Sequence, residues 1–173
     1  MDITQTSIRN LLKNIKKARD YIIIRILYET GCEVKELVKI KVSDVLGHRI
    51  RINSKEIRFS QISGKLSKDI KQYVKGNKLN KNNFLFSLRK DKPISEKRIS
   101  QIISEISYDL KIKDMTSKKI RYLHILHSYQ NNVLLHDISK QVGIDTYRVF
   151  RIIEEYHNGK GISNYNKFLK SIN

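Results

Sequence analysis

The apolar residues of this chain change their spacing along the sequence, and this change limits the folds open to it. Over residues 8–39 they recur every three to four positions, which indicates helices. Over residues 48–60 they alternate with polar residues, which indicates strands. The helical spacing then returns from residue 66 onward, with an interruption at 83–86. The pattern predicts a mainly α fold with a small three-stranded antiparallel sheet inserted after the third helix.

Three helices are predicted before the sheet. Residues 4–7 can cap the first, whose apolar stripe consists of Ile8, Leu11, Leu12 and Ile15. The second spans 18–30 and is apolar nearly all round, which is typical of a buried central helix. Gly31 is a suitable residue to follow its C-terminus. The third helix is short, over residues 34–39.

The alternating segments predict the strands of the sheet. Residues 48–53 and 56–60 are two of them, joined by a tight turn at Asn53, Ser54 and Lys55. Residues 83–86 are predicted as the short third strand. An amphipathic helix over 66–74 is expected between the second and third strands.

The remaining sequence is predicted to be helical. Ser95 should cap a helix that follows Pro93, and Ser117 should cap a helix over residues 118–131. Two short helices are expected over 133–156, on either side of Gly143. Residues 161–173 read as a weak helix. We therefore predict one compact domain over residues 1–160 and a C-terminal helical tail over 161–173.

The charge and the cysteine content exclude several classes of protein. The 173 residues carry a formal net charge of +18, spread along the chain, which should attract polyanions. The single cysteine, Cys32, excludes a disulfide framework and a cysteine-based zinc site. No apolar run reaches the length of a membrane span, and the N-terminus lacks the apolar region of a signal peptide. We therefore expect an intracellular protein, cytoplasmic or nucleoid-associated, that does not bind membranes.

The order of several short motifs resembles the catalytic domain of the tyrosine recombinases, the integrase family. The family's pattern reads RDxxxxxLLYxTG, SEL, WSDI, LF, GKPLS and TPHxLRH, followed by an LGH turn. The matching stretches are, in order, Arg19–Tyr21 with Tyr28–Gly31, Glu36–Leu37, Ser43–Val45, Phe84–Ser87, Lys92–Ser95 and Thr116–Arg121. Gly143 follows Arg121 by 22 residues, which fits the family's interval without a gap. The resemblance covers roughly residues 5–158.

This resemblance implies a chemistry and a set of site residues. In the family, a tyrosine attacks a DNA phosphodiester to form a 3′-phosphotyrosine, without a metal or other cofactor. Two arginines hold the phosphate oxygens, which suits the planar guanidinium. Arg121 matches the second arginine, and Lys118 matches the histidine or lysine of the HxLR motif. Lys55 lies where the family has the hairpin lysine that protonates the leaving oxygen, and Tyr156 is the candidate nucleophile.

The chain departs from the family's pattern at several site positions. Glu33 replaces the first arginine, and a carboxylate there should repel phosphate by about 4 kcal/mol per charge pair at ~4 Å and a dielectric of about 20. Ile144 replaces the histidine of the LGH turn, and Tyr122 follows Arg121 where histidine is usual. The ungapped nucleophile position is Ile153, three residues before Tyr156. We therefore expect strand cleavage to be lost or strongly impaired.

Residues 137–153 also resemble a helix-turn-helix of bacterial repressors, with Gly143 in the turn. Its recognition helix would expose Thr146, Tyr147, Arg148 and Arg151 toward DNA, and Lys119 is a further predicted DNA contact. The alternative is an ordinary helical hairpin. Three histidines, His124, His127 and His136, lie in this half of the chain. A metal site would also need a carboxylate at a compatible distance, and we predict instead histidines at the edge of the core with hydrogen-bond partners.

The sequence thus predicts a protein that binds double-stranded DNA and derives from a tyrosine recombinase. The alternatives are a minimal active integrase or resolvase and a helix-turn-helix transcription regulator. The family's separate N-terminal DNA-binding domain is expected to be missing, because Met1 precedes the first predicted helix by only a few residues. The tail is expected either to pack on a neighbouring subunit, giving a homo-oligomer, or to dock on its own domain.

Overall fold

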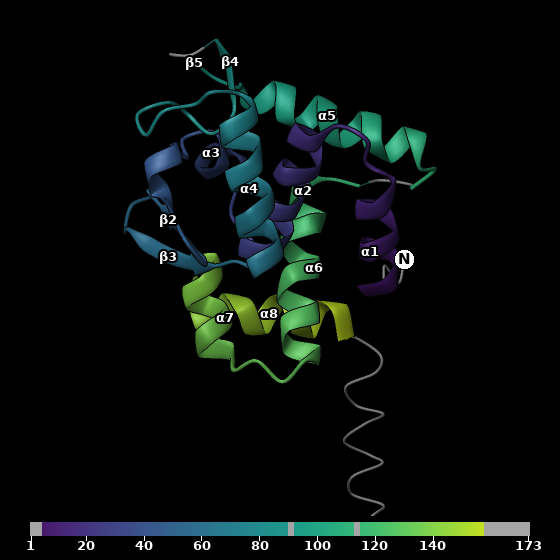
Figure 1. Ribbon diagram of the computed structural model, residues 1–173. Coiled ribbons are helices and arrows are strands. Elements are labelled where there is room, and N and C mark those ends of the chain that lie inside the picture. Colours follow the sequence, from purple (N-terminus) through teal and green to yellow (C-terminus); the bar gives the residue numbers. More distant parts are fainter. Residues whose placement is uncertain (1–4, 90–91, 113–114, 158–173) are drawn as a thin grey trace, which may run out of the picture.

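The computed structural model describes residues 5–89, 92–112 and 115–157. Figure 1 shows helices around a small sheet, which confirms the mainly α fold with a three-stranded antiparallel sheet. The helices are α1 Gln5–Asn14, α2 Ala18–Thr30, α3 Val34–Leu37, α4 Gly64–Gly76, α5 Glu96–Asp109, α6 Ser117–Gln130, α7 Leu135–Val142 and α8 Thr146–His157. A 3₁₀ turn spans Val42–Asp44, and the strands are β1 Val45–Leu46, β2 Arg49–Ile52, β3 Arg58–Gln61, β4 Ser87–Arg89 and β5 Lys92–Pro93.

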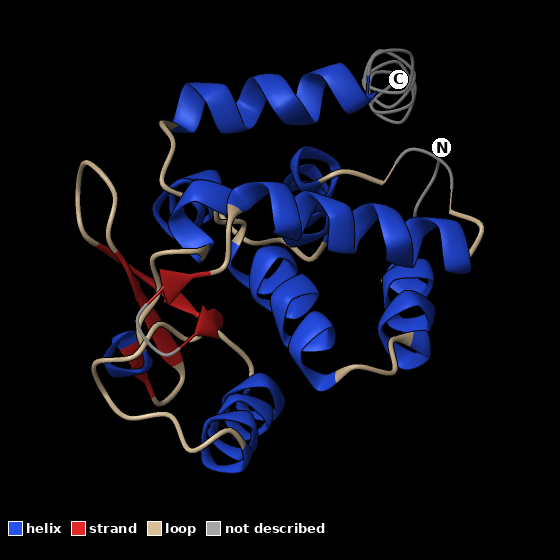
Figure 2. Cartoon of the chain, turned by 90° about the horizontal axis from the view of Figure 1, so that it is seen from above, coloured by secondary structure: helices blue, strands red, loops and turns tan. Residues whose placement is uncertain are grey.

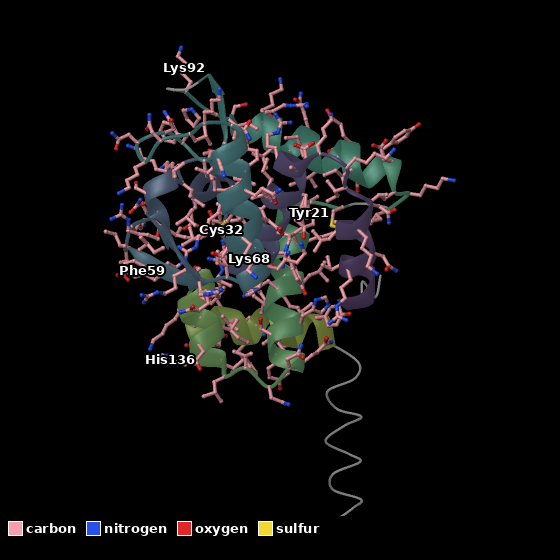
Figure 3. All side chains as sticks on the ribbon, in the orientation of Figure 1. Tyr21, Cys32, Phe59, Lys68, Lys92 and His136 are labelled. Atoms are coloured by element: carbon pink, nitrogen blue, oxygen red, sulfur yellow. The ribbon has the colours of Figure 1, made fainter. Side chains whose placement is uncertain are left out.

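The three-stranded sheet has the order β1-β2-β3, with both pairs antiparallel. Ile50 and Ile52 point to the core, whereas Phe59 lies on the outer face, where Figure 3 shows it at the edge of the molecule. The prediction of the third strand at 83–86 was wrong, because Phe84 forms only an isolated bridge with Lys41. The turn is also longer than predicted, since residues 53–57 separate β2 from β3.

The main core surrounds α2, as its apolar sequence predicted. Four of its isoleucines and Leu27 are buried, and residues of the sheet, of α4 and of α5 pack around them. Gly31 ends the helix with a φ of 61°, which glycine adopts readily. Cys32, the next residue, is buried in this core, as expected for a small apolar side chain.

The last three described helices form a second, smaller core. Figure 1 shows α7 and α8 beside the lower end of α6, and Figure 2, seen from above, shows the strands gathered on one side of the molecule. The predicted pair of helices about Gly143 is confirmed, and this glycine ends α7 with a φ of 71°. The buried side chains of this core are Ile125, Leu126, Ile138, Val142, Val149, Ile152 and Ile153.

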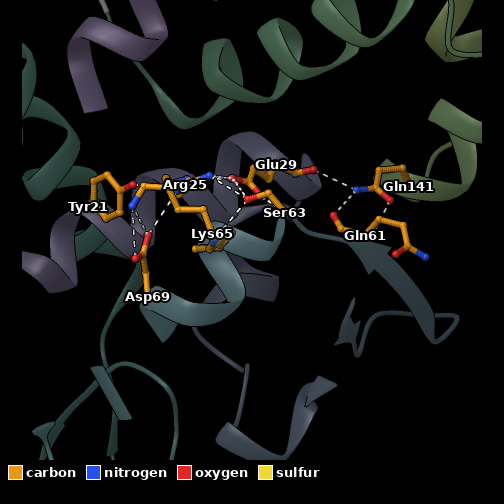
Figure 4. Close-up of polar contacts among 9 residues, drawn as sticks. Tyr21, Arg25, Glu29, Gln61, Ser63, Lys65, Asp69 and Gln141 are labelled. Atoms are coloured by element: carbon orange, nitrogen blue, oxygen red, sulfur yellow. Dashed lines mark hydrogen bonds and ion pairs between the residues drawn. The ribbon is translucent and has the colours of Figure 1, made fainter. Parts of the chain in front are cut away.

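Gln141 on α7 helps to join this second core to the sheet, and its backbone carbonyl also accepts hydrogen bonds from the β3 side chains Arg58 and Ser60. The amide of Gln141 accepts a hydrogen bond from the Gln61 backbone N–H (2.8 Å) and donates to the Gln61 carbonyl (2.8 Å) and the Glu29 carbonyl (2.9 Å). Figure 4 shows this contact continuing into the ion pair between Glu29 and Arg25. Gln141 therefore satisfies the outer edge of β3 much as a neighbouring strand would.

The predicted helix starts agree with the structure in part, since α4 begins two residues before the predicted 66 and α7 two residues after the predicted 133. Ser95 accepts a hydrogen bond from the Arg98 N–H at the start of α5, as predicted. The cap of α6 is Thr116 rather than Ser117, and its hydroxyl accepts a hydrogen bond from the Lys119 N–H at 3.2 Å. The predicted tail over 161–173 lies outside the described residues. Among the described helices, none has the length and apolar character needed to cross a membrane.

Candidate functional site

A cavity of about 350 Å³ opens where α3, α5, α6 and α8 meet. Four of its lining residues carry a positive charge (Lys35, Lys118, Arg121 and Arg148) and two carry a carboxylate (Glu33 and Glu96). Its other lining residues are Cys32, Val34, Ser117, Tyr122, Ile144 and Ile152. The cavity therefore combines an excess of positive charge with an apolar floor.

Arg121 lies at the centre of this charge distribution. It stands on the second turn of α6, and its side chain is only 11% exposed. Its Nη1 forms an ion pair with Glu33 Oε1 at 2.9 Å, and its Nη2 donates to the Val142 carbonyl at 3.0 Å. The guanidinium is thus fixed between the start of α3 and the end of α7, so its direction in the cavity is set by both cores.

The N-terminus of α6 adds further positive potential to the cavity. Ser117 and Lys118 belong to its first turn, where backbone N–H groups lack helical partners and carry a partial positive charge. The Lys118 ammonium is exposed and lies 5.5 Å from the centre of the Tyr122 ring. This cation–π contact keeps Lys118 near the cavity without neutralising its charge.

Glu33 is fixed by the start of α3, where it is the N-cap of a capping box with Glu36. Its carboxylate is shared between Arg121 and Lys35, whose Nζ lies 2.7 Å from Glu33 Oε2. The hydrogen bond from Lys35 and the charge of Arg121 lower the pKa of Glu33 despite its partial burial. Glu33 is therefore an anion at neutral pH, and it faces the arginine that the family's pattern assigns to phosphate.

A second, deeper ion pair supports the cavity from behind. Glu36 forms a bidentate pair with Arg58 on β3, at 2.7 and 2.8 Å, and both side chains are about nine-tenths buried. Burial alone would raise the pKa of Glu36, but the hydrogen bonds from Arg58 and from the Glu33 backbone, together with the charges of Arg58 and Arg121, lower it. Sequence analysis did not single out Arg58. The alternating pattern gave no signal for it, since that pattern places the apolar Ile57 and Phe59 on the core face, whereas both are exposed and the side chain of Arg58 is only 10% exposed.

The apolar lining explains which chemistry the cavity lacks. Ile144 and Ile152 occupy the wall nearest α8, and neither can donate a hydrogen bond to an oxyanion. Burial raises the pKa of the Cys32 thiol to about 11, so this sulfur stays protonated and is a poor nucleophile at neutral pH. Among the lining residues that the structure describes, the hydroxyl groups belong to Ser117 and Tyr122.

Two of the four predicted catalytic residues line the cavity and two do not. Arg121 and Lys118 are brought together, as the family's pattern implies. Lys55 is exposed in the loop between β2 and β3. Tyr156 is 39% exposed near the end of α8 and is not a lining residue, and Ile153, at the ungapped nucleophile position, is buried in the second core.

The predicted DNA contacts lie on one end of the molecule. Tyr147 and Arg148 are exposed in the first turn of α8, Arg151 is exposed one turn later, and Lys119 is exposed at the start of α6. Arg151 forms an ion pair with Glu154 at 2.7 Å. Arg148 is the one among them that also lines the cavity, so the cavity and the exposed face of α8 are continuous.

Two of the three histidines of this region pack on Tyr28, and the third is exposed. Tyr28 lies 2.9 Å from His127 Nδ1, and its ring packs edge-on against that of His124. His136 is exposed on α7. Within the described residues, no group of three or more His, Cys, Asp or Glu side chains could hold a metal ion.

Comparison with known proteins agrees with this geometry. Residues 2–157 match the model of the phage integrase family. The tyrosine recombinase XerH of Campylobacter jejuni subsp. jejuni serotype O:2 is 24% identical to this chain over 152 residues, which are 82% of the chain and 42% of XerH. The chain thus spans less than half the length of this relative.

Solved structures show the same fold. A XerA recombinase superposes with a TM-score of 0.75 and 18% identity, over 89% of this chain and 64% of that one. XerH bound to its difH substrate in a pre-cleavage complex gives 0.71 and 18%, over 83% and 46%. A Tn1549 transposon integrase in complex with a circular intermediate DNA gives 0.75 and 14%, over 88% and 60%. The chain belongs to the phage integrase family and has the fold of a tyrosine recombinase catalytic domain.

Proposed function

We propose that this chain binds double-stranded DNA through the basic face around the cavity and that its strand cleavage is lost or strongly impaired. The observation that carries the proposal is the convergence of Arg121 and Lys118 in one cavity whose remaining positions lack the family's groups. A phosphate of the DNA backbone is the ligand that this charge distribution suits. The DNA complexes of the structural relatives support the same partner.

The binding part of the proposal rests on a continuous positive surface. Lys118 and Lys119 begin α6, and Arg148 connects the cavity to the exposed side of α8. A helix N-terminus and exposed cations are suited to the phosphates on both sides of a DNA groove. We expect these residues to set the position of the duplex, since phosphate contacts carry orientation rather than sequence information.

The loss of cleavage rests on three positions of the site. Glu33 places a negative charge beside Arg121, Ile144 donates no hydrogen bond, and Ile153 offers no nucleophile. Removing one transition-state donor typically lowers a rate by about 10²–10³. Three such departures in one site leave Lys118 and Arg121 to bind a phosphate without a tyrosine at the family's ungapped nucleophile position.

A second candidate function is a transcription regulator that reads a groove with α8. It is favoured by the exposure of this helix, in which Tyr147 is 71% exposed. An active recombinase that uses Tyr156 remains the alternative within the enzyme class. In either case the cavity and α8 would contact the same duplex. We further propose that the chain self-associates through residues 161–173.

The test of the proposal measures binding and cleavage on the same DNA. Binding to labelled duplex should be tight at about 50 mM salt and fall by 10³ or more toward about 200 mM, because counterions are released from the phosphates. A pool of nicked duplexes of randomised sequence then traps any covalent adduct, which a denaturing gel detects. We expect binding without adduct.

Two substitutions make this test specific for the cavity. Arg121→Ala should weaken DNA binding, whereas Arg98→Ala removes the same charge from an α5 residue that does not line the cavity and should change binding little. Absence of binding at low salt would contradict the proposal. A covalent adduct that Tyr156→Phe abolishes would instead establish the active recombinase. Tyr122→Phe tests whether the tyrosine that lines the cavity forms the adduct.

A further inference from the structure

We propose that Glu33 is a resident anion that occupies the phosphate position on Arg121, so that the cavity admits a phosphate group only when this carboxylate is neutral or displaced. The inference deepens the proposed function, because it concerns the regulation of the same site. Under this proposal Glu33 competes with phosphate for Arg121, in addition to replacing the arginine that the family has at this position.

The proposal rests first on the two contacts that the Arg121 guanidinium makes. Its Nη1 is bound to Glu33 Oε1 at 2.9 Å and its Nη2 to the Val142 carbonyl at 3.0 Å. The guanidinium has five N–H groups, and a phosphate oxygen that binds it through Nη1 must replace the Glu33 carboxylate or share Nη1 with it. Carboxylate and phosphate bind a guanidinium through the same charge-assisted hydrogen bonds, so the two compete for one position.

Hydrogen bonds at the start of α3 fix the position of Glu33. The start of α3 fixes its backbone, because the Glu33 N–H donates to Glu36 Oε2 at 2.8 Å. Glu36 is itself fixed by Arg58, whose guanidinium binds both of its carboxylate oxygens. The competing carboxylate therefore stands on a rigid support, and moving it away from Arg121 requires rotation of its side chain only.

The charged residues of the cavity differ in whether they are paired with Arg121, and this difference separates Glu33 from Glu96. Lys35 is already paired with Glu33, whereas Lys118 and Arg148 have no ion pair among the described residues. Glu96, on α5, is the second carboxylate of the lining, but it has no ion pair with Arg121 within the described part of the chain. Neutralising Glu33 thus frees Arg121, and neutralising Glu96 lowers the negative charge of the cavity by the same amount without freeing it.

This difference gives a matched pair of variants. Glu33→Gln removes the charge and keeps a side-chain oxygen that can accept the hydrogen bond from the Glu36 N–H at the helix start. Glu96→Gln is the control for the general electrostatic effect. Glu33→Ser is a second test variant, because serine is a preferred N-cap residue and is too short to reach Arg121.

The experiment titrates inorganic phosphate into each full-length protein by calorimetry at low salt. We expect Glu33→Gln and Glu33→Ser to bind phosphate roughly tenfold or more tightly than the unmodified chain, and Glu96→Gln to differ from it by less than about threefold. Thermal unfolding shows that each variant is folded. Adding Arg121→Ala to Glu33→Gln should abolish the gain.

Equal affinity of the folded Glu33 variants and the unmodified chain would overturn the inference, as would an equal gain in Glu96→Gln. Duplex DNA binding by the unmodified chain, measured in parallel, separates this outcome from failure of the proposed function. If the chain binds DNA and the Glu33 variants gain nothing, only the resident anion is wrong. If it does not bind DNA but the variants gain phosphate affinity, the proposed function fails and the resident anion stands.

Discussion

At the scale of single residues, His124 is a buried polar group that lies between Arg121 of the cavity and Tyr28 of the main core. It lies on α6 one turn after Arg121, and its Nε2 is buried without a hydrogen-bond partner among the described residues. Desolvation, together with the nearby charge of Arg121, lowers the pKa of His124 to about 4, against the opposing effect of its hydrogen bond to the Tyr28 backbone. The neutral ring packs on Tyr28 and on the turn at Gly31.

The lowered pKa predicts a loss of stability in mild acid. An unfolded chain protonates His124 near its ordinary pKa of 6.5, whereas the folded chain does so only near 4. The unfolded state therefore binds more protons between these values, and the free energy of unfolding should fall as the pH is lowered through this window. The slope contributed by His124 is at most about 1.4 kcal/mol per pH unit.

Urea unfolding at several pH values between 6.5 and 4.5 measures this slope. His124→Phe should remove it, because an apolar ring of similar shape has no proton to bind. His136→Phe is the matched control on exposed α7 and should leave the slope unchanged. Glu36 adds to this slope only near the lower end of the window, because an unfolded glutamate begins to protonate as the pH approaches 4.5, whereas the pKa of Glu36 in the fold is lower. A slope that persists in His124→Phe would show that another group is responsible.

At the scale of secondary structure, the turn between α7 and α8 depends on Gly143 for two reasons. Its φ of 71° is costly for other residues, and a Cβ there would lie 2.7 Å from the Arg58 guanidinium. Arg58 cannot easily withdraw, because both of its terminal nitrogens are bound to Glu36. The turn, the sheet and the back of the cavity therefore meet at this glycine.

Gly143→Ala should therefore destabilise the chain more than an alanine at another positive φ. Gly47 provides the comparison, since its φ is 67° but a Cβ there would meet nothing within 4 Å. We expect Gly47→Ala to cost about 1 kcal/mol and Gly143→Ala to cost roughly 2 kcal/mol or more in the free energy of unfolding. Chemical denaturation of the two variants measures both. Equal losses would mean that Arg58 moves aside without cost.

The elements themselves were predictable to different degrees. The helix over 18–30 was found within its exact bounds, because its apolar residues and Gly31 both mark it. The strand at 45–46 was missed, since two residues are too few to show alternation. Residues 83–86 were read as a strand because three of the four are apolar, but Leu85 and Phe86 are buried core side chains on a bend of the chain. Burial alone does not make a strand.

At the scale of the whole molecule, the site could be predicted only in part. The motif spacing placed Arg121, Lys118, Glu33 and Ile144 together, and all four line one cavity. The supporting contacts of Arg58 and Gln141 were not predicted. Each joins segments that are far apart in the sequence, and Gln141 bonds to Gln61 across 80 residues. Polar contacts of this kind have no periodic signal, so only the three-dimensional arrangement reveals them.

Residues 161–173 are predicted to decide whether the chain associates with a second copy. Their apolar side chains recur at helical spacing, in the order Ile162, Tyr165, Phe168, Leu169 and Ile172. A helix of this length is marginal in water unless a groove covers its apolar side. The described surface near α7 offers exposed apolar side chains for such a contact, since Leu134 is 70% exposed. We therefore expect the tail to bind a second copy of the chain.

Deleting residues 161–173 should then convert dimers or higher species to monomers, which light scattering coupled to gel filtration measures. Leu169→Asp should have the same effect, because it places a charge in the middle of the apolar stripe. Ser163→Asp adds the same charge on the opposite side of the predicted helix and should leave the mass unchanged. A full-length chain that is already monomeric, and whose mass per particle the deletion lowers only by the missing residues, would show that the tail covers its own domain instead.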